Sequence, residues 1–251
     1  MTLRASTGAR SDVGGVRSRN EDSFCVRPEA GLWAVADGMG GHQNGQWASE
    51  AIADHLVNVK LPTNFDGACK AIADGIHAAN AQIHAQASAR GVPMGSTVVA
   101  LYLSGGRFAV FWAGDSRAYL LRDGFLHQLS VDHSQVQEMV DRGLLTPDQA
   151  QRHPMSHVLV RAVGVAATLQ LDGIVDETQP GDHFLLCSDG LHGTVADGEI
   201  AAMLNASAGR DPTDALVDLT LERGAPDNVT VVTVALSEAT QLDLAGAEGR
   251  R

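Results

Sequence analysis

The candidate catalytic residues of this sequence are acidic, and four of them stand at the ends of apolar, strand-like segments. They are Asp37, Asp115, Asp189 and Asp227. If these segment ends meet in the fold, repulsion between the carboxylates would raise their pKa values and destabilise the protein. A bound divalent cation removes that cost, and a ligand set made only of oxygens suits Mg²⁺ or Mn²⁺. The pattern therefore favours a metal site.

The same aspartates have a simpler explanation, because Asp37 and Asp189 are followed by glycine and Asp227 by asparagine. Such dipeptides are common in turns, where the aspartate side chain bonds its own backbone and glycine tolerates a positive φ. For any one of these residues a turn is the better explanation. The four together favour the metal, with the turn kept as the alternative.

Further charged residues gather near the N-terminus. Glu21 and Asp22 precede an apolar segment at 24–26, and Arg17 stands four residues before Glu21. A guanidinium beside a pair of metal ions can clamp a phosphate with two hydrogen bonds. The alternative is a salt bridge from Arg17 to Glu21 or Asp22. The residues alone thus indicate an oxygen-ligated metal site, with a phosphate ester as the candidate substrate.

Other catalytic signatures are missing from the sequence. Its histidines and cysteines form no H-E-x-x-H or C-x-x-C pair, which disfavours a zinc site. No G-x-S-x-G elbow of a serine hydrolase occurs. The glycine-rich segment 37–45 fits neither common nucleotide-binding pattern. Cys187 lies inside an apolar segment, so we expect a buried thiol rather than a nucleophile.

Composition narrows the class of protein. The 251 residues carry a formal net charge of -12, which argues against binding to nucleic acid and against a polybasic membrane anchor. No apolar run approaches the ~20 residues of a membrane span, and residues 1–10 lack the apolar stretch of a secretory signal. An odd number of widely spaced cysteines is typical of reduced thiols. We therefore expect a cytoplasmic protein without nucleic-acid or membrane partners.

The apolar patterns predict strands and helices along the whole chain. Strands are expected at 31–36, 96–103, 107–113, 118–122, 125–129, 183–187 and 229–236. Helical periodicity covers 46–59, 66–89, 133–142 and 211–223. Hairpins in series between helix pairs favour an α+β fold with antiparallel sheets covered by helices. We expect a single domain at 11–236, after a flexible N-terminus at 1–10 and before a disordered tail at 237–251.

Six segments together resemble a known family, the metal-dependent PP2C-type (PPM) serine/threonine protein phosphatases in their compact bacterial form. The matching segments are 11–24, 33–42, 95–103, 112–124, 181–191 and 226–234. Each segment alone is a moderate signal, whereas the ordered set is highly specific and covers nearly the whole chain.

The resemblance implies a four-layer αββα sandwich of two antiparallel sheets flanked by helix pairs, with a metal centre at one end of the sheets. By the motifs of the family, Asp37 would bridge two Mn²⁺ or Mg²⁺ ions, and the carbonyl of Gly38 would bind one of them. Asp189 and Asp227 would hold the other ion.

The resemblance also assigns roles around those two ions. Glu21 and Asp22 would act through metal-bound waters, and Asp115 with Asp189 would hold a third, weaker ion. Arg17 matches the phosphate-binding arginine of the family. A water between two dications has a lowered pKa and can attack phosphorus near neutral pH, so no nucleophilic side chain is required.

Two places depart from the family pattern. Met39 stands where eukaryotic relatives have a histidine that protonates the leaving oxygen, and His42 comes three residues later. Residues 130–164 resemble the flap of bacterial members, with His157 where relatives usually have asparagine. The leaving-group acid and the flap contacts therefore stay open, with a metal-bound water as the candidate acid.

The function implied by the resemblance is hydrolysis of phosphoserine and phosphothreonine on proteins by a monomeric enzyme that opposes a bacterial Ser/Thr kinase. One alternative is a phosphatase of the sporulation and stress-response type, which usually carries extra sensor domains. Another is a catalytically dead binding module of the same fold. Such a module should have lost metal-site aspartates, and all four are present here.

Overall fold

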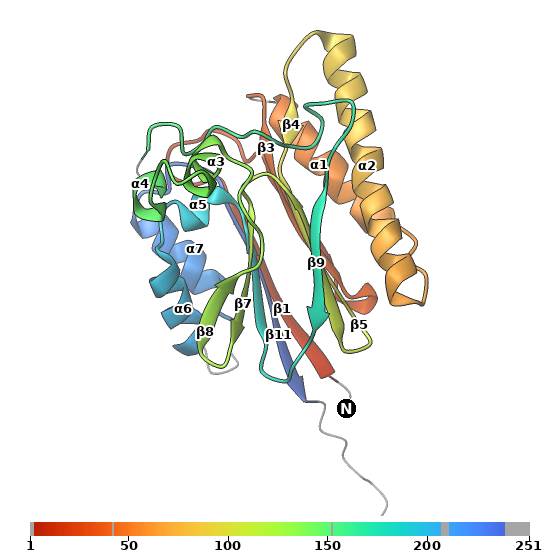
Figure 1. Ribbon diagram of the computed structural model, residues 1–251, viewed down its shortest axis with the longest axis vertical. Coiled ribbons are helices and arrows are strands. Elements are labelled where there is room, and N and C mark those ends of the chain that lie inside the picture. Colours follow the sequence, from red (N-terminus) through yellow and green to blue (C-terminus); the bar gives the residue numbers. More distant parts are fainter. Residues whose placement is uncertain (1–2, 42, 152, 207–210, 239–251) are drawn as a thin grey trace, which may run out of the picture.

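Two antiparallel sheets stack face to face, and helices cover both outer faces (Figure 1). This arrangement is seen in a computed structural model, which describes residues 3–41, 43–151, 153–206 and 211–238. The order of the layers is helices, sheet, sheet, helices. The expected four-layer αββα sandwich is therefore confirmed.

The first sheet has five strands. In spatial order they are β1 (Leu3–Asp12), β11 (Val229–Glu238), β10 (His183–Cys187), β7 (Arg117–Arg122) and β8 (Phe125–Gln128). The central strand β10 pairs with both neighbours in antiparallel register, so that Cys187 lies between Val231 and Arg117. Asp189 follows this strand after a single residue, Ser188, and Asp227 stands two residues before β11.

The second sheet has six strands. In order they are β2 (Asp22–Arg27), β3 (Leu32–Met39), β5 (Val98–Ser104), β6 (Arg107–Ala113) and β9 (Asp172–Glu177), with β4 (Gly95–Ser96) paired to β3. A short 3₁₀ turn, η1 (Pro28–Ala30), joins β2 to β3. The strand expected at 96–103 is thus divided into β4 and β5 at Thr97.

Seven helices lie in the described part of the chain. They are α1 (Gln43–Asn58), α2 (Phe65–Arg90), α3 (Gln135–Asp141), α4 (Pro147–Gln151), α5 (Asp189–His192), α6 (Asp197–Ala206) and α7 (Thr213–Glu222). The long helices α1 and α2 cover one sheet, and α6 and α7 cover the other (Figure 1). None of the described helices is long and apolar enough to cross a membrane.

The core has three apolar layers, which explains why the strands are almost continuously hydrophobic. In β3, Trp33 and Val35 face the opposite sheet, whereas Leu32, Ala34 and Ala36 face α1 and α2. Alternate side chains of a strand point to opposite faces, so a strand covered on both sides needs apolar residues at every position. The third layer packs the first sheet against α6 and α7.

The expected flexible N-terminus is wrong from Leu3 onward. Residues Leu3–Asp12 form β1, which pairs with β11 over all ten positions, from Leu3 opposite Glu238 to Asp12 opposite Val229. Backbone hydrogen bonds hold this edge strand, so a strong apolar pattern is not required. The expected tail at 237–251 also begins too early, because β11 includes Ser237 and Glu238. Residues 239–251 lie outside the described residues.

Candidate metal centre

A cavity of about 960 Å³ opens at the end of the sandwich that carries the carboxyl ends of β3, β6 and β10. Seven of the eight site residues expected from the sequence line it. They are Arg17, Glu21, Asp37, Gly38, Asp115, Asp189 and Asp227. Turns alone would not bring these side chains to one place from segments so far apart in the chain, so the convergence favours a common site.

Each aspartate is positioned by the element beside it. Asp37 lies within β3, and Asp115 follows β6 after a single glycine. Asp189 is the first residue of α5, and Asp227 stands two residues before β11. The second sheet thus supplies Asp37 and Asp115, while the first sheet supplies the other two. The carboxylates therefore lie where the two sheets meet at one edge.

The backbone around Asp37 is firmly held. Its amide donates to Thr97 Oγ1 at 3.0 Å, and its carbonyl accepts from the Thr97 amide at 2.8 Å and from Ser96 Oγ at 2.9 Å. The next residue, Gly38, donates from its amide to the Glu21 carbonyl at 3.1 Å. A side chain at Gly38 would collide with the backbone of Gly45 and Glu21, so only glycine fits here.

Burial and neighbouring charges raise the pKa values of two cavity carboxylates, Asp37 and Asp115. Although Asp37 opens onto the cavity, burial raises its pKa well above the usual range, and Asp22, Asp189, Asp115 and Asp227 raise it further. Burial, followed by the charge of Asp189, raises the pKa of Asp115 to about 8. Burying carboxylates close together destabilises a protein, and sites that do so typically bind cations.

The donor set fits hard divalent cations bound partly through water. Among the described residues, no three His, Cys, Asp or Glu side chains are gathered closely enough to enclose an ion by themselves. Instead, carboxylates line a roomy cavity together with the backbone of Gly38. Mg²⁺ needs few direct protein ligands because it keeps several waters, and oxygen ligands also suit Mn²⁺. The site can therefore hold such ions, whereas a closed cage of side chains is not present.

Asp22 is placed differently from the expectation that it would act through metal-bound water. It does not line the cavity but is buried behind it, where Oδ2 accepts from Ser188 Oγ at 2.8 Å and from Thr230 Oγ1 at 2.7 Å. Its other oxygen, Oδ1, is buried with no hydrogen-bond partner. Burial raises the pKa of Asp22 to about 7. We therefore retain Asp22 as a neighbouring acidic group rather than as a cavity ligand.

Arg17 lies on the acidic rim of the cavity. Its Nη2 donates to Asp227 Oδ2 at 2.7 Å, a partner that neither sequence alternative named. The side chain is 57% exposed, so the guanidinium is accessible from solvent. The hydrogen bond to Asp227 and the charge of that residue, and less strongly the charges of Glu21 and Asp189, raise the pKa of Arg17. Arg17 is therefore a cation available at the mouth of an acidic cavity.

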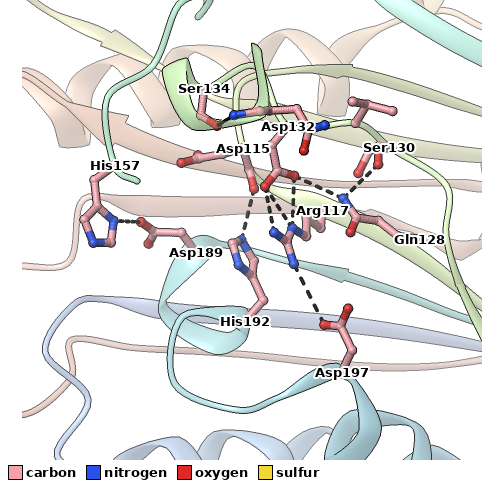
Figure 2. Close-up of polar contacts among 12 residues, drawn as sticks. Asp115, Arg117, Gln128, Ser130, Asp132, Ser134, His157, Asp189, His192 and Asp197 are labelled. Atoms are coloured by element: carbon pink, nitrogen blue, oxygen red, sulfur yellow. Dashed lines mark hydrogen bonds and ion pairs between the residues drawn. The ribbon is translucent and has the colours of Figure 1, made fainter. Parts of the chain in front are cut away.

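A polar network that no sequence pattern predicts surrounds Asp115 (Figure 2). His192 Nε2 donates to the Asp115 carbonyl at 3.0 Å, which ties α5 to the segment that carries Asp115. Next to it, Arg117 Nε and Nη2 donate to Asp132 at 2.9 and 2.7 Å. Arg117 falls within a matched segment, but no pattern in the sequence indicates its pairing with Asp132.

A second missed residue is His133, which holds the turn before Asp115. Its Nδ1 accepts from the Gly114 amide at 3.1 Å, so the ring proton is on Nε2, which lies 3.1 Å from Asp172 Oδ2. Arg161 donates to the same carboxylate, at 2.8 Å from Oδ1. His133 thereby links the end of β6 to β9 and to the segment 157–165.

The departures from the family pattern lie at the cavity as well. Met39 and His157 both line it, and His157 Nδ1 lies 3.6 Å from Asp189 Oδ2 (Figure 2). His42 lies outside the described residues. Met39 carries no proton that it could give to a leaving group. The cavity wall at this point therefore consists of a thioether on one side and a histidine of the segment 130–164 on the other.

The chain is thus an αββα sandwich whose two sheets end at a shared acidic cavity. Residues 15–230 match the protein phosphatase 2C family, so the chain belongs to that family.

Individual relatives agree with this assignment. The serine/threonine protein phosphatase PstP of Mycobacterium tuberculosis is 39% identical over 261 residues, which cover 98% of this chain and 49% of PstP. The chain thus spans about half the length of that relative.

Two solved structures share the fold. PppA, described as a key regulatory component of T6SS in Pseudomonas aeruginosa, is 42% identical with a TM-score of 0.85, covering 92% of this chain and 97% of PppA. The catalytic domain of PstP in complex with two manganese ions is 36% identical with a TM-score of 0.84, covering 94% of this chain and all of that one.

Proposed function

We propose that this chain is a metal-dependent protein phosphatase that hydrolyses phosphoserine and phosphothreonine on proteins. The observation that carries the proposal is the convergence of four strand-end aspartates and Arg17 on one cavity. The acidic groups suit dications, and the guanidinium suits a phosphate. Membership of the protein phosphatase 2C family and the two manganese ions bound to the PstP catalytic domain support it.

In this proposal the metal ligands come from both sheets. Asp37, the Gly38 carbonyl, Asp189 and Asp227 would together hold two Mn²⁺ or Mg²⁺ ions, with Asp37 shared between them. When bound, two dications lower the pKa of the water between them, which makes a nucleophile available near neutral pH. The backbone contacts of Asp37 and Gly38 support these roles, because they hold in place the chain that carries the ligand oxygens.

Outer residues complete the proposed site. Glu21 acts through water, and Asp115 with Asp189 holds a third, weaker ion. Arg17 binds the substrate phosphate, for which its guanidinium must share or leave the contact with Asp227. The guanidinium then neutralises charge on the equatorial oxygens of the phosphate. Because Met39 lacks a transferable proton, the leaving-group proton is proposed to come from water in the cavity.

The physiological setting is also proposed. The substrates are phosphoproteins made by a cognate Ser/Thr kinase, and the enzyme acts as a cytoplasmic monomer in signal transduction. The three cysteines are free thiols, which supports a reducing compartment. Segment 130–164 is proposed to serve as a flap, since residues 157–162 form part of the cavity wall. The catalytically dead module is disfavoured because the four aspartates expected at segment ends, Asp37, Asp115, Asp189 and Asp227, all line the cavity.

The direct test is phosphate release from matched peptides that carry phosphothreonine, phosphoserine or phosphotyrosine, measured with Mn²⁺ and with Mg²⁺. The proposal expects turnover of the first two peptides and much weaker turnover of the third. Release of phosphate from none of them would reject the proposed activity, and a preference for phosphotyrosine would reject the substrate class.

A further inference from the structure

One wall of the cavity is unusually apolar for a surface that faces solvent. Val158, Val160 and Val165 line the cavity, and they are 38%, 45% and 59% exposed. We call these three residues the apolar wall. Single exposed valines need no explanation, but three on one wall of a functional cavity indicate a contact surface. Burying aliphatic side chains against them would remove apolar area from water.

The apolar wall is held rigidly. The Val160 amide donates to the His133 carbonyl at 2.9 Å, and the Val163 amide donates to the Ser96 carbonyl at 2.8 Å. Buried Asn80 of α2 accepts from the Gly164 amide at 2.7 Å and donates to the Ala166 carbonyl at 3.1 Å. A surface fixed at both ends loses little conformational entropy when a partner binds. The wall is therefore a preformed surface.

The nearest cation of this segment is already engaged. Arg161, which stands between Val160 and Val163 in the chain, donates to Asp172 at 2.8 Å. The protein as a whole has a formal net charge of -12. Acidic groups on a partner would therefore meet repulsion from the acidic protein, and the arginine of the described segment 157–165 is already paired. An uncharged aliphatic partner suits this wall better.

We infer that the apolar wall binds an aliphatic side chain of the substrate protein, two positions from the phosphorylated residue; this rests on the function proposed above. When a phosphorylated side chain enters the cavity, the substrate residues on either side of it must lie against the cavity lining. In an extended segment, side chains two positions apart point the same way, about 6.6 Å apart. The wall thus selects phosphoproteins with valine, isoleucine or leucine at that spacing.

The test uses phosphothreonine peptides with valine, serine or aspartate placed two residues before or two residues after the phosphothreonine. At one of these two positions, kcat/KM should be about tenfold higher for the valine peptide than for the serine peptide. At the same position, kcat/KM should be lowest for the aspartate peptide. Val160→Ser and Val165→Ser should each bring the valine-to-serine ratio toward one. The control Val175→Ser removes a valine that is 50% exposed on β9, away from the cavity, and should keep the wild-type ratio.

Three outcomes would overturn the inference. Equal kcat/KM for valine and serine peptides at both positions would show that the wall does not select the substrate. A ratio unchanged by Val160→Ser and Val165→Ser would place the selectivity elsewhere. Sedimentation showing a dimer that Val165→Ser dissociates would assign the wall to a second copy. In all three cases peptides are still hydrolysed with Mn²⁺, whereas hydrolysis of no peptide would reject the proposed function itself.

Discussion

Asp22 in β2 lies directly opposite Asp37 in β3, in register across the antiparallel pair. The Asp37 carboxyl opens onto the cavity, whereas that of Asp22 is buried behind it. Burial raises the pKa of both groups, and the Asp22 charge raises the pKa of Asp37 further. Like charges at one step of a ladder destabilise the sheet unless protons or cations compensate them. Removing one of these two charges should therefore change the thermal stability of the metal-free protein.

The first prediction concerns Asp37→Asn. In EDTA this variant should melt a few degrees above the wild type, because the amide has no charge to desolvate; each kcal/mol corresponds to about 2–4 °C in a domain of this size. Mn²⁺ should raise the Tm of the wild type by binding only the folded state, and raise that of the variant much less. Thermal melts with and without Mn²⁺ measure both effects. An undiminished Mn²⁺ shift in Asp37→Asn would remove Asp37 from the ligand set.

The second prediction concerns pH. Burial raises the pKa of Asp22 to about 7 and that of Asp115 to about 8, from an ordinary value of 3.8. A group whose pKa is higher in the folded state stabilises the fold below the unfolded pKa and loses that contribution as pH rises through the folded pKa. In EDTA, the Tm should therefore fall from about pH 5 to pH 8. Saturating Mn²⁺ should oppose the fall, because metals bind the deprotonated carboxylates.

Melts across that pH range, with EDTA and with Mn²⁺, check this prediction. Asp115→Asn provides the control, since it should flatten the upper part of the EDTA curve. A metal-free Tm that rises between pH 5 and pH 8 would contradict the raised pKa values.

The third prediction concerns Arg17. Arg17→Ala should lower kcat/KM for phosphopeptides about 10- to 100-fold, because a charge-assisted hydrogen bond to phosphate contributes about 1.5–3 kcal/mol. Arg17→Lys should recover only part of the loss, since an ammonium lacks the two-pronged geometry. The contact with Asp227 is exposed, so the Tm should change little. Kinetics at saturating Mn²⁺ together with melts would show a purely structural role if the Tm fell while kcat/KM stayed at the wild-type value.

The fourth prediction concerns Asp115. If it serves a third, weaker ion, Asp115→Ala should keep two tight Mn²⁺ sites and lose most turnover. The variant should fold, because its carbonyl still accepts from His192 and its neighbour Gly114 still bonds His133. Calorimetric titration with Mn²⁺ counts the tight sites. Loss of a tight site would instead assign Asp115 to the core pair.

Much of the fold follows from local patterns. The apolar segment before Asp37 and the helical stripe at 66–89 predict β3 and α2. A strand buried on both faces is continuously apolar, and a helix buried along one stripe repeats its apolar residues every three to four positions. The N-terminal strand was missed for the opposite reason. In β1, Ala5, Gly8 and Ala9 give little apolar signal, and the strand is held by its backbone ladder with β11.

The candidate site was predictable in its residues but only partly in its geometry. Strand-end positions identify Asp37 and Asp189, yet spacing alone does not show that they converge on one cavity. For Asp22 hydropathy misleads, because this acidic residue is buried while Phe24 on the same strand is 39% exposed. The contact between His157 and Asp189 depends on the stretch 153–164, which lies outside the named helices and strands and has no periodicity that would predict the path of the chain.

The measurement that tests the central claim most directly is the initial rate of phosphate release from a phosphothreonine peptide, as a function of free Mn²⁺, for the wild type and Asp37→Asn. If carboxylates of the cavity hold the ions that activate water, the wild-type rate should rise from near zero in EDTA to a plateau. Asp37→Asn should remain far below that plateau at every concentration. Full wild-type turnover in excess EDTA, or a variant that reaches the wild-type plateau, would contradict the account.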